Sequence, residues 1–217
     1  MKIHQNSKLL FIGDSITDWS RARPIGEALF DSLGTGYVGL VNAFLNVTHA
    51  SQRIRVVNMG VSANTVRDLE ARWSTDVEAL KPDWLSIMIG VNDVWRQFDA
   101  RLQTENHVLI DEYEATLERL ILRTMPRLKG LVLMAPYFVE FNREDPMRKM
   151  IDAYGAVLKR LAEKHGAIFA DTQAAFDEMM TEIHPMGIAT DRVHPTLTGH
   201  LIIARAFLKA VGYPVSP

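Results

Sequence analysis

The sequence predicts an α/β protein in which helices cover both faces of a parallel sheet. Short apolar runs alternate along the chain with longer amphipathic stretches, which is the order that right-handed βαβ units produce. The runs are almost continuously apolar, as expected for strands that are buried on both faces. Because the sequence contains no linker or internal repeat, we expect a three-layer α/β/α sandwich that forms one domain over residues 1–217.

Each expected element has its own local signal. The apolar runs that we predict to be strands are, in chain order, Lys8–Ile12, Ile54–Met59, Trp84–Ile89, Leu131–Ala135 and Ala167–Ala170. The amphipathic stretches that we predict to be helices are Thr65–Leu80, Asp111–Leu128, Asp145–His165 and Thr196–Val211. The third helix has the clearest limits, because an Asp-Pro pair opens it and glycine follows its last residue.

Three longer irregular pieces are expected, at Trp19–Gly36, Trp95–Leu109 and Tyr137–Glu144. Each follows a predicted strand at its carboxyl end. In open α/β sheets the ligand crevice lies at that edge. We therefore expect the functional site there.

Composition narrows the class of protein. The net charge is −2, which gives no electrostatic reason to expect nucleic acid or an anionic membrane as partner. The absence of cysteine excludes disulfides, thiolate metal sites and a cysteine nucleophile. The N-terminus lacks the apolar core of a signal peptide, and no apolar run approaches the roughly 20 residues of a membrane span. We expect a cytoplasmic protein without a membrane segment.

The first motif is Gly13–Asp18, directly after the first predicted strand. Gly13 permits a tight turn, and Ser15 would then lie exposed at the sheet edge with its N–H directed as at a helix N-terminus. The alternative is an ordinary N-capping serine. By itself the motif is a weak signal for a catalytic serine.

Two further motifs follow the second and third strands. Asn58–Thr65 combines a glycine turn with a capped helix start, so that a backbone N–H could face the same crevice. In Ile89–Asp93, Asn92 would present a neutral side-chain amide, which suits an oxyanion hole. The alternatives are a capped loop and an asparagine in a turn.

The fourth motif is Asp191–Pro195, just before the last helix. An Asp and a His three residues apart on a loop can turn so that the carboxylate of Asp191 meets Nδ1–H of His194, which leaves Nε2 free as a base. The alternative is a surface Asp beside a helix-preceding His. Together the four motifs supply a nucleophile, two oxyanion donors, a base and its partner, in chain order and at the ends of the predicted strands.

This combination resembles the SGNH hydrolases, the GDSL-type esterase and lipase superfamily, over nearly the whole chain. The resemblance implies a flavodoxin-like sandwich with five parallel strands. It also implies Ser15 as nucleophile, His194 as base, Asp191 as its partner and Asn92 as side-chain donor. Within the superfamily, four runs are similar to the small bacterial acetylxylan esterases that deacetylate xylo-oligosaccharides inside the cell: Gly13–Asp18, Gly34–Val38, Asn64–Leu69 and Ile87–Gln97.

The chain departs from the family at Ala63, where glycine is usual and where a backbone N–H is implied as an oxyanion donor beside that of Ser15. Alanine keeps the N–H, but a positive φ there would strain it by roughly 1 kcal/mol or more. We expect Ala63 to keep the role. Asp14 is interpreted as structural.

Other residues near the motifs have two readings. Trp95 and Arg96 follow the Asn92 loop, where they could bind a sugar ring or form a lid or subunit contact. The spacing of His184, His194 and His200 matches no metal-ligand pattern, so we expect neither a metal nor another cofactor. A homo-oligomer is plausible from charged loops and aromatic residues near the edge.

The function expected from these motifs is a serine esterase acting on O-acetylated xylo-oligosaccharides or related sugars. One alternative keeps the triad and changes the ester, giving a lysophospholipase, thioesterase or arylesterase. Another is a flavin- or nucleotide-binding module, although Asp14 and Asp18 would repel phosphate at the first turn. The last is a non-catalytic carbohydrate-binding protein of the same fold.

Overall fold

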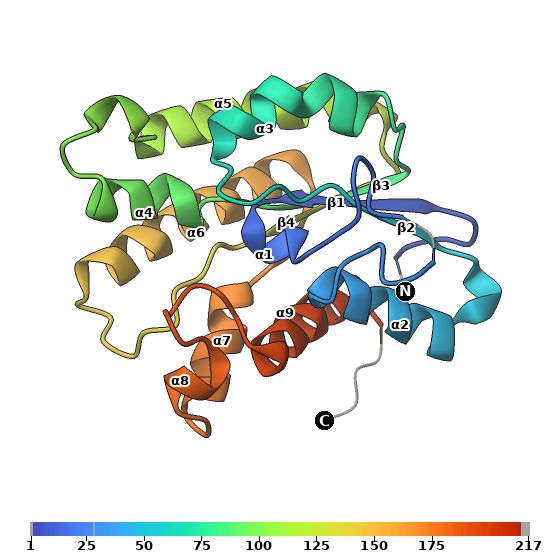
Figure 1. Ribbon diagram of the computed structural model, residues 1–217. Helices are drawn as coiled ribbons and strands as arrows, with labels where there is room; N and C mark the ends of the chain where they lie inside the picture. The colour runs from blue at the N-terminus through green and yellow to red at the C-terminus, as the bar shows by residue number, and fades with distance from the viewer. Residues whose placement is uncertain (1, 28, 214–217) are drawn as a thin grey trace.

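A five-stranded parallel sheet forms the centre of the computed structural model, which describes residues 2–27 and 29–213 (Figure 1). Its strands are β1 (Lys8–Gly13), β2 (Arg55–Asn58), β3 (Trp84–Met88), β4 (Gly130–Met134) and β5 (Ile168–Ala170). They lie in the order β2-β1-β3-β4-β5, and every neighbouring pair is parallel. This is the flavodoxin-like order, so the predicted sandwich and its five strands are confirmed.

Burial explains why the strand sequences are continuously apolar. Strand β1 lies between β2 and β3, and its residues Leu9, Leu10, Phe11 and Ile12 have no exposed surface. Side chains that point to opposite faces of the strand are therefore equally buried, because helices cover both faces.

Helices form the two outer layers of the sandwich (Figure 1). The α-helices within the described residues are α1 (Ser15–Asp18), α2 (Tyr37–Thr48), α3 (Val66–Trp73), α4 (Val91–Asp99), α5 (Ile110–Thr124), α6 (Pro146–His165), α7 (Thr172–Met180), α8 (Pro185–Ile188) and α9 (Leu197–Ala210). Helices α3, α5 and α6 cover one face of the sheet, and α2, α7 and α9 cover the other. Short turns of 3-10 helix lie at Ala50–Gln52, Thr104–Asn106 and Met125–Arg127.

The predicted helix 145–165 begins and ends where its caps indicate, whereas the predicted helix 111–128 already ends at Thr124. Asp145 accepts the backbone N–H groups of Met147 and Arg148 at the start of α6, and Gly166 ends that helix with a φ of 66°. The predicted stretch 65–80 is helical but divided, because α3 ends at Trp73 and a π-helical turn, Ser74–Glu78, continues it.

Three of the longer described helices were missing from the sequence prediction, as were the short helices α1 and α8. The stretch 95–109, expected to be irregular, begins inside helix α4, and α2 and α7 lie in segments to which no helix was assigned. The first turn of helix α2 contains a β-branched residue, Val38, and a glycine, Gly39, and both lower the helix propensity of the segment. The segment is helical because it packs against α9, with Tyr37, Val41 and Leu45 buried along one side of the helix.

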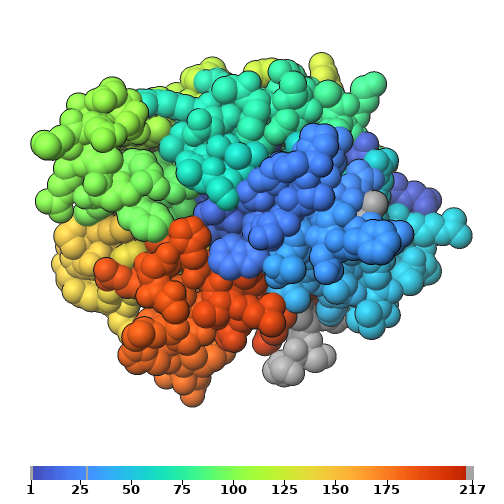
Figure 2. All heavy atoms as spheres, viewed as in Figure 1, coloured from blue at the N-terminus to red at the C-terminus, as the bar shows by residue number. Residues whose placement is uncertain are grey.

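The irregular segment 19–36 is confirmed except at Ala28, which lies outside the described residues, and 137–144 is also irregular. In Figure 2 the blue segment around α1 and the orange segment that precedes α9 meet on the face turned toward the viewer. Among the residues that the structure describes, no helix has both the length and the apolar character needed to cross a membrane.

Candidate active site

Ser15 is the first residue of helix α1 and lies just beyond strand β1. Asp14 caps this helix, since its Oδ1 accepts the backbone N–H of Ile16 at 3.0 Å. The Ser15 side chain is half-buried at the carboxyl edge of the sheet. Its Oγ lies 3.0 Å from Nε2 of His194. At that distance the imidazole can accept the hydroxyl proton.

His194 and Asp191 lie in the loop between α8 and α9. Nδ1 of His194 is 2.6 Å from Oδ2 of Asp191, while Oδ1 accepts the backbone N–H groups of Val193 at 3.0 Å and His194 at 2.7 Å. A carboxylate only accepts, so the proton is on Nδ1 and the lone pair of Nε2 faces Ser15. Partial burial acts to raise the pKa of Asp191, but the hydrogen bonds from His194 and Val193 outweigh it and lower that pKa.

The three predicted oxyanion donors follow three adjacent strands. Asn92 is buried in the first turn of α4, and its Nδ2 donates one N–H to the carbonyl of Asn64 at 3.0 Å. A primary amide has a second N–H, which stays available. Within residues 2–27 and 29–213, the backbone N–H groups of Ser15 and Ala63 have no acceptor. All three donors are therefore free to bind an oxyanion.

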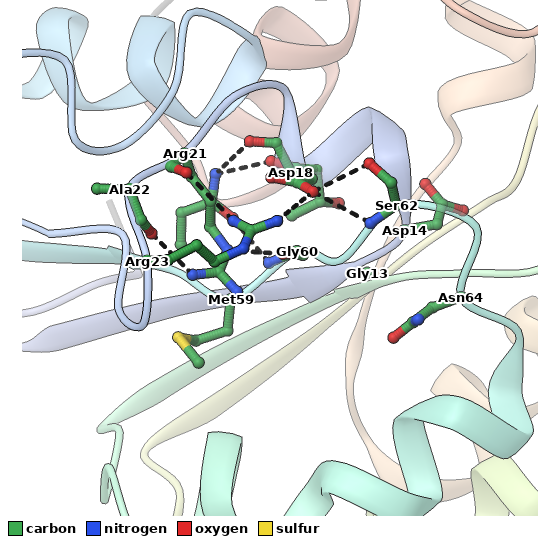
Figure 3. Close-up of polar contacts among 12 residues, drawn as sticks. Gly13, Asp14, Asp18, Arg21, Ala22, Arg23, Met59, Gly60, Ser62 and Asn64 are labelled. Atoms are coloured by element: carbon green, nitrogen blue, oxygen red, sulfur yellow. Dashed lines mark hydrogen bonds and ion pairs between the residues drawn. The ribbon is translucent and has the colours of Figure 1, made fainter.

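The loop that carries Ala63 is fastened to the start of α1. The N–H of Val61 donates to the carbonyl of Gly13 at 3.0 Å. Oδ2 of buried Asp18 accepts the N–H of Ser62 at 3.1 Å and its Oγ–H at 3.0 Å (Figure 3). The two segments approach so closely that a Cβ on Gly60 would lie 2.2 Å from the backbone nitrogen of Asp18. Glycine is therefore required at position 60.

Ala63 has a φ of 65°, in the left-handed region that glycine favours. An alanine in that conformation is strained by about 1–2 kcal/mol. The strain that we expected for a positive φ at Ala63 is therefore present. The N–H is retained with no acceptor from the protein, as the predicted role requires.

Replacement of Ala63 by glycine is expected to raise the free energy of unfolding by about 0.5–1 kcal/mol, because relief of strain exceeds the added flexibility of the unfolded chain. We expect kcat to stay within about threefold of wild type, since the N–H is unchanged. Denaturant unfolding and steady-state kinetics measure both quantities. An increase in kcat by orders of magnitude would contradict this, since it would mean that the methyl group misplaces the donor.

Two carboxyl groups are buried close to the oxyanion donors. Burial raises the pKa of Asp14 to about 7, although its hydrogen bond from Ile16 and the nearby His194 oppose the shift. Burial also raises the pKa of Asp93 to about 7. Oδ1 of Asp93 accepts the N–H of Val66, the first residue of α3, at 2.9 Å, and its Oδ2 has no partner among the described residues. Asp14 and Asp93 are therefore both bonded to helix starts, and the structural interpretation of Asp14 fits this geometry.

The Asp93 carboxyl is expected to make stability fall as pH rises. Its pKa is about 7 in the folded protein and near the ordinary aspartate value of 3.8 in the unfolded chain, so the folded state binds more protons between these values. The loss across this window is up to about 4 kcal/mol. Asp93→Asn keeps the acceptor for Val66 and removes the titration, so its free energy of unfolding should decrease less between about pH 4 and pH 8. Equal slopes for both proteins, in urea unfolding at several pH values, would contradict this assignment.

Two tryptophans border His194. The Trp95 ring lies 5.8 Å from the imidazole and the Trp19 ring 6.3 Å from it, measured between ring centroids. Trp19 also packs edge-on against His200 at 4.2 Å. The guanidinium of Arg96 lies 5.5 Å from the Trp95 ring and donates to Oδ1 of Asn92 at 3.5 Å. Trp95 and Arg96 are thus beside the site, and their contact with substrate stays a prediction.

The sequence predicted the triad and the oxyanion donors, but not the residues that hold them in place. It did not single out Trp19, the Asp18 carboxylate as the acceptor for Ser62, or the Asp93 carboxylate as the acceptor for Val66. Trp19 directly follows the first motif and Asp93 directly follows Asn92, so their positions offered a signal. The acceptor role of Asp18 offered none, because its partner is 44 residues away.

His200, the third histidine considered as a metal ligand together with His184 and His194, is buried beside Trp19. Its Nδ1 accepts the N–H of Tyr37 at 3.1 Å, and burial lowers its pKa to about 4. Among the residues described, no group of three or more His, Asp or Glu side chains is placed to hold a metal ion.

The chain matches one family model, and it is similar in sequence and structure to several known hydrolases. A family model described as the GDSL-like Lipase/Acylhydrolase family matches residues 11–202. An acetylxylan esterase from Geobacillus stearothermophilus is 56% identical over 213 residues, which cover 98% of this chain and 97% of that protein. An α/β hydrolase from the metagenome of Lake Arreo, Spain, has a structure with a TM-score of 0.97 at 52% identity, and the match covers 100% of both chains.

Crystal structures of catalytic mutants of an acetylxylan esterase from Geobacillus stearothermophilus also match. Their substitutions are S15A, D191A and H194A, with TM-scores of 0.97 and identities of 55–56%. The matches cover 99–100% of this chain and 98–100% of those chains. This chain has the same residue types at the same three numbers.

Proposed function

This chain belongs to the GDSL-like lipase/acylhydrolase family, and from that premise we propose that it is a serine esterase that removes O-acetyl groups from xylo-oligosaccharides or related acetylated sugars. The observation that carries the reaction type is the chain of short contacts from Ser15 Oγ through His194 to Asp191. The acetylated-sugar substrate is supported by the 56% identity, over nearly the full chain, to an acetylxylan esterase from Geobacillus stearothermophilus. The catalytic mutants of that esterase at positions 15, 191 and 194 support the triad.

The first half of the reaction transfers the acetyl group to the protein. Ser15 Oγ attacks the ester carbonyl carbon while its proton moves to Nε2 of His194. Asp191 stabilises the imidazolium through Nδ1–H. The carbonyl oxygen becomes an oxyanion, which the N–H groups of Ser15 and Ala63 and the amide of Asn92 bind. When the C–O bond to the sugar breaks, the sugar oxygen takes the proton from His194.

The second half regenerates the serine. Water gives a proton to His194 and attacks the acetyl carbonyl, and the same three donors bind the second oxyanion. The bond to Ser15 Oγ then breaks, Oγ recovers its proton from His194, and acetate leaves. One ester and one water thus give one acetic acid, which ionises to acetate and a proton, and one sugar hydroxyl. We propose that a single catalytic domain, residues 1–217, carries out both halves.

The surroundings of His194 suit a carbohydrate leaving group. Because His194 delivers the proton to the sugar oxygen, the sugar ring lies close to the imidazole. Trp19 and Trp95 are both within stacking range of that region, and aromatic faces pack well against apolar patches of sugar rings. Arg96 beside Trp95 is a donor for ring hydroxyls.

Acetate release distinguishes the substrates. We expect rapid release from acetylated xylo-oligosaccharides and from nitrophenyl acetate, with nitrophenyl octanoate hydrolysed poorly. Ser15→Ala is the control for each ester. Fast hydrolysis of octanoate with no reaction on the sugar would move the protein to the lysophospholipase, thioesterase or arylesterase alternatives. Absence of Ser15-dependent turnover on every ester would refute the esterase.

The location of the protein, its oligomeric state and its lack of nucleic-acid and membrane partners stay predictions. We propose a cytoplasmic homo-oligomer that binds neither nucleic acid nor a membrane. Light scattering during size-exclusion chromatography measures the oligomeric state, and fractionation of the source cells locates the protein. A monomer, or a protein recovered outside the cytoplasm, would correct the respective statement.

A further inference from the structure

We propose that Arg72 is a positioning residue for the oxyanion hole, because its guanidinium joins the segments that carry Ser15 and Ala63 and is linked to Asn92 through Asn64. The inference rests on the proposed function, since it assumes that Ser15, Ala63 and Asn92 bind the oxyanion. Arg72 is in helix α3, outside every sequence motif, and its side chain is only 15% exposed.

The guanidinium makes three contacts with the neighbouring loops. Nη2 donates to the carbonyl of Gly13 at 3.0 Å, and Nη1 donates to the carbonyl of Met59 at 2.7 Å. Nε donates to Oδ1 of Asn64 at 2.7 Å. Gly13, Met59 and Asn64 can be followed in Figure 3. One planar group therefore joins the end of β1 to both ends of the loop after β2.

Each contact leads directly to an oxyanion donor. Gly13 is two residues before Ser15, and the other two contacts are on either side of Ala63. Asn64 extends the link to the third donor, since its carbonyl accepts the side-chain amide of Asn92 at 3.0 Å. Two other contacts, from Val61 to Gly13 and from Ser62 to Asp18, also join the first two segments. Arg72 adds the contact with Asn64, through which the Asn92 amide is linked to the end of β1. We therefore expect the relative positions of the three N–H groups to depend in part on Arg72.

Arginine is required for geometric reasons. Its donors are fixed in one plane and point in several directions, so it can hold three acceptors at once. A lysine ammonium is a single point with a different reach, and cannot reproduce this set. Asp76 restrains the guanidinium from the π-helical turn, accepting from Nη1 at 2.7 Å, and itself accepts from Thr75 Oγ1 at 2.8 Å. The charge of Arg72 is thus balanced away from the donors.

This role predicts a particular kinetic signature. The donors bind charge that develops only in the transition state, so their misplacement lowers kcat and leaves KM nearly unchanged. Loss of one oxyanion donor lowers kcat by about 10²–10³. A residue that only stabilised the fold would instead lower the melting temperature and the amount of active protein, while the remaining folded protein kept its kcat.

The experiment compares Arg72→Lys, Arg72→Ala and wild type on nitrophenyl acetate, with rates corrected for the folded fraction. We expect kcat to fall by about 10–100-fold in Arg72→Lys and about 10²–10³-fold in Arg72→Ala, with KM within about threefold. Added methylguanidinium, at concentrations that do not unfold the protein, should restore at least part of kcat in Arg72→Ala. It should not act on wild type or on Ser15→Ala.

Arg119→Ala is the matched control. Arg119 is in α5 and donates to Glu70 of α3 at 3.0 Å, so it also contacts α3, but from the exposed surface. Its replacement should leave kcat unchanged. If Arg72→Ala does not fold, Arg72→Lys decides the question by the same kinetic criterion.

The outcomes separate this inference from the proposed function. If wild type shows no Ser15-dependent turnover, the proposed function is wrong and the inference fails with it. If wild type turns over and Arg72→Lys keeps wild-type kcat, the positioning role alone is overturned. The same holds if KM and kcat change equally, or if methylguanidinium restores nothing in a folded Arg72→Ala.

Discussion

Replacement of Ser15 by alanine is expected to lower kcat by roughly 10⁴–10⁶, measured on nitrophenyl acetate and on acetylated xylo-oligosaccharide. The variant lacks the hydroxyl oxygen that lies 3.0 Å from Nε2 of His194. Water would have to attack the substrate ester directly, without the covalent intermediate that Ser15 forms. The oxyanion donors remain, which is why some rate above the uncatalysed reaction should persist.

Ser15→Ala should lower kcat without destabilising the fold. Ser15 is half-buried and its side chain does not cap α1, which Asp14 does, so the melting temperature should change little. Ser20→Ala is the control, since Ser20 is an exposed serine just after the same helix. Mass spectrometry of a rapidly quenched reaction should detect an acetyl group on Ser15 in wild type. Near-wild-type turnover in Ser15→Ala would assign the nucleophile elsewhere.

The sheet could be predicted because its signal is local. A strand such as Leu9–Ile12 is apolar at every position, and burial on both faces is the only common setting for such a run. Helix α2 could not be predicted in this way. Its sequence has weak helix propensity, and the stripe formed by Tyr37, Val41 and Leu45 becomes decisive only when α9 packs against it.

In the candidate site, too, contacts between residues close in sequence could be predicted, whereas contacts between distant segments could not be predicted from spacing alone. Asp191 and His194 are three residues apart, so their contact follows from one turn of the chain. The proximity of Ser15 to His194, 179 residues away, followed from the family resemblance and from the rule that parallel strands end at one edge. The conformation of Ala63 and the contacts of Arg72 depend on packing between loops, which no spacing encodes.

Replacement of Asp191 by asparagine is expected to lower kcat by about 10⁴, through a change in the tautomer of His194. Asp191 accepts the Nδ1 proton at 2.6 Å, which leaves the Nε2 lone pair toward Ser15. An asparagine amide in that place donates to Nδ1 instead. The proton then moves to Nε2, where the imidazole can no longer accept the serine proton.

The loop itself should survive the substitution. The asparagine carbonyl can still accept the N–H groups of Val193 and His194, as Oδ1 of Asp191 does at 3.0 and 2.7 Å. The melting temperature should therefore change little, and KM should stay near the wild-type value because binding does not require the Nε2 lone pair. Asp31→Asn, at an exposed aspartate, is the control. A decrease in kcat of less than about tenfold would show that His194 keeps its reactive tautomer without the carboxylate, and that Asp191 acts only as a loop cap.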